Sequence, residues 1–172
     1  GRETLAAWSG VLRNAVIHRA TPVMAAGPVT ADPLGTTLEY AAAGDGGTPG
    51  VRTVLTAYAA LPRLDFAVTV TPPPAADRAD ACYLAFPFAA RRPEVYVDLP
   101  GAVMRPGLDQ IPGSATDWHS VQHYFAVADG TDWTAVVATP DAPLLQVNGI
   151  NTGLWQEQLP PPNGTVMSWL MN

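Results

Sequence analysis

Three segments of the sequence combine Asp, Asn or Gln with turn-forming and aromatic residues: residues 109–119, 148–156 and 160–165. An aromatic ring stacks on the C–H face of a pyranose, while carboxylate and amide groups form hydrogen bonds with neighbouring hydroxyls. The three segments therefore predict a carbohydrate-binding surface. Its predicted substrate-binding residues are Asp109, Gln110, Asp117, Trp118, Asn148, Trp155 and Asn163.

The same residue types also have a structural interpretation. Asp, Asn and Gly are turn formers, and Trp118 and Trp155 would then cover the ends of a sandwich. For each segment alone the structural interpretation is favoured, and the recurrence of three segments brings the two interpretations into balance. Residues 163–165 also match the N-glycosylation pattern, which is short and common.

The other chemical groups of the chain give weaker signals. His119 and His123 lie four residues apart, but Ser120 stands where a zinc-binding helix has Glu. On a strand the two imidazoles would be about 13 Å apart, too far to share a metal ion. No Gly-x-Ser-x-Gly motif is present, and only Ser114 neighbours a glycine within a predicted loop. Cys82 lies in an apolar strand, which indicates an inert core thiol.

Alternation of apolar and polar residues predicts the elements that would position these groups. It is clearest at residues 94–99, where Val95, Val97 and Leu99 share one face, and it recurs at residues 65–70 and 121–127. Further predicted strands are residues 51–58, 81–88, 133–139, 144–147 and 165–171. Turn formers separate them, and residues 41–50 predict a hairpin loop without the Gly-Lys-Ser/Thr ending of a phosphate loop. Many short strands indicate an all-β antiparallel sandwich.

The two ends of the chain are assigned differently. Leu5, Trp8 and Leu12 favour one short helix at residues 3–12, although Ser9 and Gly10 weaken it, and residues 14–19 fit a strand equally well. Residues 1–172 are predicted to form a single domain in which residues 1–30 are poorly assigned. Because the sequence stops inside a predicted strand, we expect a fragment of a longer enzyme. Its edge through Val166 and Trp169 should be exposed or paired with another copy of the chain.

Composition excludes several function classes. The 172 residues carry a net charge of −6, and their nine basic residues are all Arg, so no nucleic-acid partner is expected. Hydrophobic residues make up 48% of the chain, which suffices for a core. No apolar run approaches the ~20 residues of a membrane span, so we expect no membrane partner and a cytoplasmic location.

A set of motifs occurs in an order that resembles a known family. The motifs are LPRLDF at residues 61–66, YLAFPF at 83–88, DQIPGS at 109–114 with DW at 117–118, TPDAPL at 139–144, and PPNGT at 161–165 with SW at 168–169 and MN at 171–172. This set resembles the β-sandwich portion that follows the catalytic barrel in bacterial family-38-like glycoside hydrolases, the α-mannosidase group. The resemblance covers about residues 50–172.

The resemblance implies an antiparallel supersandwich like that of galactose-mutarotase-like domains, and a parent enzyme that hydrolyses α-mannosides with retention. It further implies a nucleophile and a zinc ion in the missing N-terminal catalytic barrel. This chain lacks the family's helical His-His-Asp segment, so no catalytic residue and no cofactor are assigned to it. Position in the family places residues 109–118 and 148–155 near the substrate, a mannoside-like carbohydrate.

A retaining glycosidase also needs two carboxyl groups about 5–5.5 Å apart. Asp109 and Asp117 are candidates across one loop, but a small sandwich offers no deep pocket to raise one pKa. We therefore expect a non-catalytic domain that supports the barrel and completes the sugar site. The alternatives are a free-standing carbohydrate-binding module and a purely structural domain.

Overall fold

The regular structure of the described residues consists of β-strands. The computed structural model describes residues 19–45, 47–74, 80–151, 156 and 158–171, and no helix occurs among them. The predicted all-β, antiparallel fold class is therefore confirmed. The short helix predicted at residues 3–12 lies outside the described residues, as do residues 14–18 of the following segment. No helix long and apolar enough to span a membrane is found in the described ranges.

The chain divides into two compact units. One comprises residues 16–78, and the other comprises residues 1–15 together with residues 79–172. We call their described parts the meander unit (residues 19–74) and the sandwich unit (residues 80–171). The single domain predicted over residues 1–172 stays a prediction.

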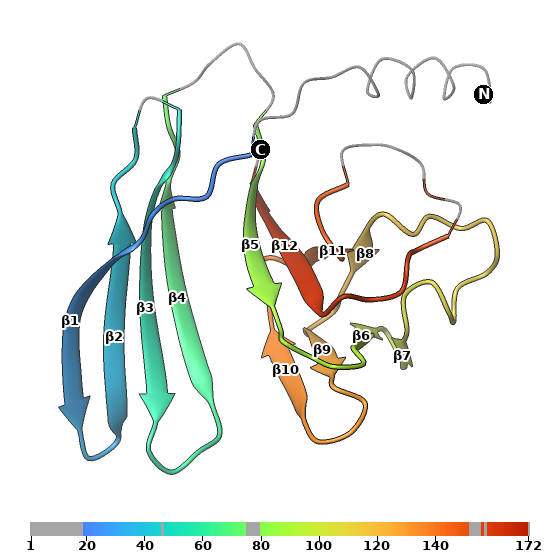
Figure 1. The fold of residues 1–172 in the computed structure, drawn as a ribbon, viewed down its shortest axis with the longest axis horizontal. Helices are drawn as coiled ribbons and strands as arrows, with labels where there is room; N and C mark the ends of the chain where they lie inside the picture. The colour runs from blue at the N-terminus through green and yellow to red at the C-terminus, as the bar shows by residue number, and fades with distance from the viewer. Residues whose placement is uncertain (1–18, 46, 75–79, 152–155, 157, 172) are drawn as a thin grey trace. The chain divides into compact units, whose positions relative to one another are not determined.

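The meander unit is one antiparallel sheet whose strands follow each other in chain order (Figure 1). Its strands are β1 (Ala25–Asp32), β2 (Gly35–Ala42), β3 (Gly50–Tyr58) and β4 (Leu64–Thr71). The hairpin loop predicted at residues 41–50 is shorter than predicted, because β2 extends to Ala42 and β3 begins at Gly50; its described residues are 43–45 and 47–49. The β1–β2 turn is closed by Asp32, whose Oδ1 accepts hydrogen bonds from the amides of Leu34 and Gly35.

The two faces of this sheet differ in polarity. Val29, Leu38, Leu55 and Phe66 are register partners across the four strands, and their row belongs to an apolar face that also carries Val68 and Val70. The next row, on the opposite face, consists of Thr30, Thr37, Thr56 and Asp65. No side chain among the described residues of this unit is fully buried, and Phe66 is 51% exposed.

The sandwich unit contains two four-stranded antiparallel sheets. The first has the order β10 (Thr134–Ala138), β9 (Tyr124–Ala128), β6 (Glu94–Leu99) and β7 (Ala102–Met104). The second has the order β5 (Cys82–Pro87), β12 (Thr165–Met171), β11 (Leu144–Val147) and β8 (His119–Ser120). Figure 1 shows the strands of both sheets.

Side chains from both sheets form one hydrophobic core. The first sheet contributes Val95, Val97, Phe125 and Val127, and the second contributes Leu145, Val147 and Val166. The rings of Phe86 and Phe125 meet edge to face across the two sheets, with centroids 5.5 Å apart. The predicted inward face of residues 94–99 is confirmed, because Val95 and Val97 are buried and Leu99 packs against the core.

The single strand predicted at residues 121–127 is wrong in its first half. β8 ends at Ser120 in one sheet, and β9 begins at Tyr124 in the other. Residues 121–123 cross between them, and the amides of Val121 and Gln122 donate to the carbonyls of Pro143 and Asp98. The alternation misleads here because a crossing residue, Val121, is also buried in the core.

The exposed edge expected through Val166 and Trp169 is also wrong. β12 lies inside its sheet and pairs with β11 on one side and with β5 on the other. Val166 is accordingly fully buried. The prediction that the chain is a piece of a longer enzyme therefore rests on the family resemblance.

Candidate functional site

The three polar segments predicted from the sequence lie together in the sandwich unit (Figure 1). A hydrogen bond from Asn151 Nδ2 to Asp117 Oδ1 joins the first segment to the second. Asn148 Nδ2 joins the second to the third through the carbonyls of Pro160 (3.0 Å) and Pro161 (3.3 Å). We call these segments the loop cluster; its described residues are 105–118, 148–151, 156 and 158–164.

Asp109 closes the first loop of the cluster. Its carboxylate accepts hydrogen bonds from the backbone amide of Arg105 at 2.8 Å and from that residue's guanidinium at 2.9 and 3.1 Å. The Arg105 guanidinium holds the pKa of the Asp109 carboxyl below its usual value. Asp109 is thus engaged by its own loop.

Gln110 braces the same loop from within. Its Oε1 accepts from the amide of Gly107 at 2.9 Å, and its Nε2 donates to the carbonyl of Ala115 at 2.8 Å. Gly107 has a φ of +77°, a conformation that glycine adopts without steric cost. The side chain of Gln110 therefore fixes the path of the loop.

Asn148 and Asn163 form a reciprocal clamp between the second and third loops. Asn148 Oδ1 accepts from the amide of Asn163 at 2.8 Å, and Asn163 Nδ2 donates to the carbonyl of Asn148 at 3.2 Å. Asn163 Oδ1 also accepts from the amide of Thr165 at 2.9 Å. Asn148 and Asn163 therefore hold the loops in place, as the structural interpretation of these residues predicted. Trp155 lies outside the described residues.

Asp117 and Trp118 are the predicted site residues with the most capacity left for a ligand. Burial raises the pKa of the Asp117 carboxyl, and the hydrogen bond from Asn151 partly offsets that effect. Trp118 is 38% exposed and stacks on Tyr83 with a centroid distance of 6.2 Å. A half-buried acid and an exposed, supported ring at consecutive positions of one loop supply the residue types of a sugar subsite.

Sequence reasoning missed two residues that hold this arrangement, Gln146 and Asn151. Gln146 is 1% exposed, and its neighbours Leu145 and Val147 point into the core, so its side chain leaves the other face of β11. Gln146 Nε2 donates to the Asn151 carbonyl, and its Oε1 accepts from the Asn151 amide, both at 3.1 Å. A lone Gln in an apolar strand just before Asn-Gly was the available signal.

The two described histidines belong to different environments. His119 is buried, its Nε2 contacts the carbonyl of Thr116 at 3.1 Å, and burial lowers the pKa of its imidazole. His123 is exposed and pairs with Asp98, with 2.9 Å between Nδ1 and Oδ2. Among the residues that the structure describes, no group of three or more His, Cys, Asp or Glu could hold a metal ion. The zinc implied by the resemblance has no ligand set in that part of the chain.

Cys82 and Ser114 show no nucleophilic arrangement. Cys82 is a partly buried free thiol, and burial raises its pKa, which disfavours the reactive thiolate. The Ser114 hydroxyl lies 3.5 Å from Gln110 Nε2. Neither environment activates a nucleophile.

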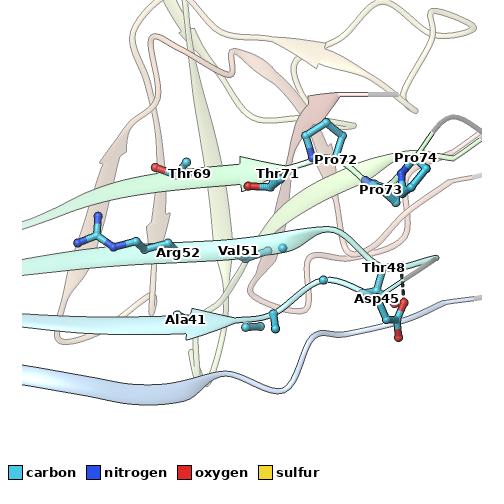
Figure 2. A pocket seen from close by; sticks show the side chains of 14 residues that line it. Ala41, Asp45, Thr48, Val51, Arg52, Thr69, Thr71, Pro72, Pro73 and Pro74 are labelled. Atoms are coloured by element: carbon cyan, nitrogen blue, oxygen red, sulfur yellow. Dashed lines mark hydrogen bonds between the residues drawn. The ribbon is translucent and has the colours of Figure 1, made fainter.

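The meander unit contains an open hollow of about 650 Å³, shown in Figure 2. Ala, Gly, Thr and Pro residues of segments 41–52 and 69–74 form most of its lining. Its two charged residues are engaged locally: Asp45 Oδ1 accepts from the amides of Gly47 and Thr48, and Arg52 pairs with Glu39 at 2.7 Å. We assign no chemistry to this hollow.

Comparisons of the chain with protein-family models, with curated proteins and with solved structures find no match.

Proposed function

We propose that the chain is a non-catalytic, galactose-mutarotase-like β-sandwich domain of a cytoplasmic, α-mannosidase-like glycoside hydrolase. In this role it supports the catalytic barrel and contributes the loop cluster to carbohydrate binding. The observation that carries the proposal is that hydrogen bonds link the three loops to one another, and that the first of them carries Asp117 and the exposed ring of Trp118. The assignment to the α-mannosidase group rests on the ordered motifs.

The charges of the loop cluster support a binding role without catalysis. Arg105 lowers the pKa of the Asp109 carboxyl, and burial raises that of Asp117, which differs from the expectation that a small sandwich would raise neither. Hydrogen bonds from Arg105 occupy both carboxylate oxygens of Asp109, which disfavours Asp109 as a nucleophile. The proposal therefore places the nucleophile, the general acid and the zinc ion in the barrel.

Apolar side chains on the first loop support contact with another polypeptide. Leu108 and Ile111 are 72% and 81% exposed, although both are large and hydrophobic. Exposed apolar side chains grouped on one loop are typical of protein–protein contacts. We assign this surface to the catalytic barrel.

Titration of the chain with α-mannosyl oligosaccharides, followed by NMR, tests carbohydrate binding. We expect millimolar binding that Trp118→Ala weakens about tenfold or more, because stacking on the ring is lost. Trp133→Ala is the matched control, since Trp133 has the same residue type and 39% exposure but lies on the β9–β10 hairpin. Absence of binding, or equal losses in the two variants, would contradict the proposal.

A second assay tests the non-catalytic part. The chain alone is incubated with an aryl α-mannoside, with and without added zinc, and release of the aryl group is followed. We expect no release above the buffer rate. Turnover at the rate of a glycosidase would show that the catalytic groups lie within this chain.

A further inference from the structure

The carboxylate of Asp117 has no arginine partner among the described residues. The sandwich unit has three described arginines: Arg105 pairs with Asp109, Arg91 lies 3.9 Å from Asp132, and Arg92 lies against Gly130. The pKa of Asp117 is shifted by burial and by Asn151, and no cation contributes to that shift. Among the residues that the structure describes, no cation pairs with the carboxylate of Asp117, which directly precedes Trp118 in the first loop.

The partly buried side-chain amide of Asn151 holds this carboxylate. Asn151 donates from Nδ2 to Asp117 Oδ1, and its own backbone is held at both its amide and its carbonyl by Gln146. Gln146 is 1% exposed in the centre of β11 and cannot follow the loop outward. A carboxylate held in this way does not readily swing aside for an unfavourable ligand.

We infer that Asp117 is a specificity-determining residue that restricts the loop cluster to neutral sugars and rejects acidic sugars. The inference rests on the proposed carbohydrate site. A neutral sugar donates a hydroxyl hydrogen to the carboxylate, whereas the carboxylate of a uronic acid is repelled by it. The chain's net charge of −6 adds to that repulsion.

Two ligands that differ at one carbon test this specificity: methyl α-mannoside and methyl α-mannuronoside, titrated separately at pH 8 by NMR. We expect the wild-type chain to bind the mannuronoside about tenfold more weakly. Asp117→Asn keeps an acceptor for Asn151 but removes the negative charge. We therefore expect the ratio of the two dissociation constants, mannuronoside over mannoside, to fall to about threefold or less. Asp141→Asn changes the net charge equally on the exposed β10–β11 loop and should leave the ratio unchanged.

The outcomes separate this inference from the proposed function. If neither ligand binds, the proposed carbohydrate site is contradicted, and so is the specificity assigned to it. If the wild-type chain binds both ligands equally, or if Asp117→Asn and Asp141→Asn change the ratio alike, the site stands and the role of Asp117 is wrong.

Gln146→Leu tests the positioning of Asp117 independently of ligand charge. We expect faster hydrogen exchange at the Asn151 amide and weaker binding of methyl α-mannoside, with the amides of β6 and β9 still protected. The exposed Gln122→Leu is the control and should change neither quantity. Unchanged exchange at Asn151 in Gln146→Leu would contradict the positioning role.

Discussion

Two glycines of the sandwich unit share a left-handed backbone but differ in the space around them. Gly164 has a φ of +86°, and a Cβ added there would clash with the carbonyl oxygen of Phe88. Gly101 has a similar φ of +79°, but a Cβ there would meet nothing within 4 Å. The two positions separate the cost of backbone conformation from the cost of a steric clash.

We expect Gly101→Ala to destabilise the sandwich unit by about 1 kcal/mol, from the left-handed backbone alone. Gly164→Ala adds a clash with backbone and should cost about 3 kcal/mol. Urea denaturation followed by tryptophan fluorescence measures both losses. Equal losses would mean that the contact with Phe88 relaxes without cost.

His119 makes the stability of the sandwich unit depend on pH. Burial lowers the pKa of its imidazole in the folded chain below the usual 6.5, so the unfolded chain binds the proton more tightly. The free energy of unfolding should therefore fall as the pH drops below about 6.5, toward the lowered folded pKa. Urea denaturation at pH 7.5 and pH 5.5 measures this difference.

His119→Gln supplies the comparison, because glutamine does not titrate and its amide can still bond the carbonyl of Thr116. We expect the variant to be less stable at pH 7.5 but to lose less stability on acidification than the wild-type chain. An equal loss in both proteins would assign the dependence to other groups.

At the scale of elements, β9 and β10 give a matched pair of valines. Val127 on β9 is fully buried in the core, while Val136 on the neighbouring strand is 62% exposed. We expect Val127→Ala to cost about 2–3 kcal/mol, because it leaves a cavity, and Val136→Ala to cost about 0.5 kcal/mol or less. Thermal denaturation of both variants checks the contrast, which similar melting temperatures would contradict.

The strands that the sequence predicted best are β6, β11 and β12, which coincide with predicted residues 94–99, 144–147 and 165–171. In β6 and β12 the alternation reflects one face buried in the core, whereas β11 is buried on both faces. β1 was not predicted, since Gly27 and Pro28 interrupt it at the irregular pairing between Ala26 and Val29. Breakers of this kind are tolerated on an edge strand, and residue type alone does not reveal an edge.

The loop cluster was predictable in position but not in role. Turn-forming residues placed Asp109, Gln110, Asn148 and Asn163 in loops, and the structure shows their side chains bonded to loop backbone and to Arg105. A hydrogen bond from a side chain to a backbone group cannot be recognised from the sequence, because every residue has a backbone. The residue types alone were therefore equally compatible with ligand binding and with bracing of the loops. The stacking of Trp118 on Tyr83 brings the first loop into contact with β5, and nothing in the sequence predicted that contact.

At the scale of the whole molecule, acidity governs the solution behaviour. The chain has a net charge of −6 at pH 7 and a sequence pI near 4.8. We expect its solubility to be lowest near pH 4.8, where mutual repulsion between molecules vanishes. Light scattering across about pH 4 to 8 measures this; a minimum above about pH 6 would contradict it.

The central place of β12 governs the order of assembly. Its partner β5 is synthesised long before it, and pairs such as Tyr83 with Trp169 join segments far apart along the chain. During translation β5 therefore has no partner strand until the residues between β5 and β12 have been synthesised. Such distant pairing slows folding, and β5 remains an unpaired, aggregation-prone strand until residues 165–171 have been made.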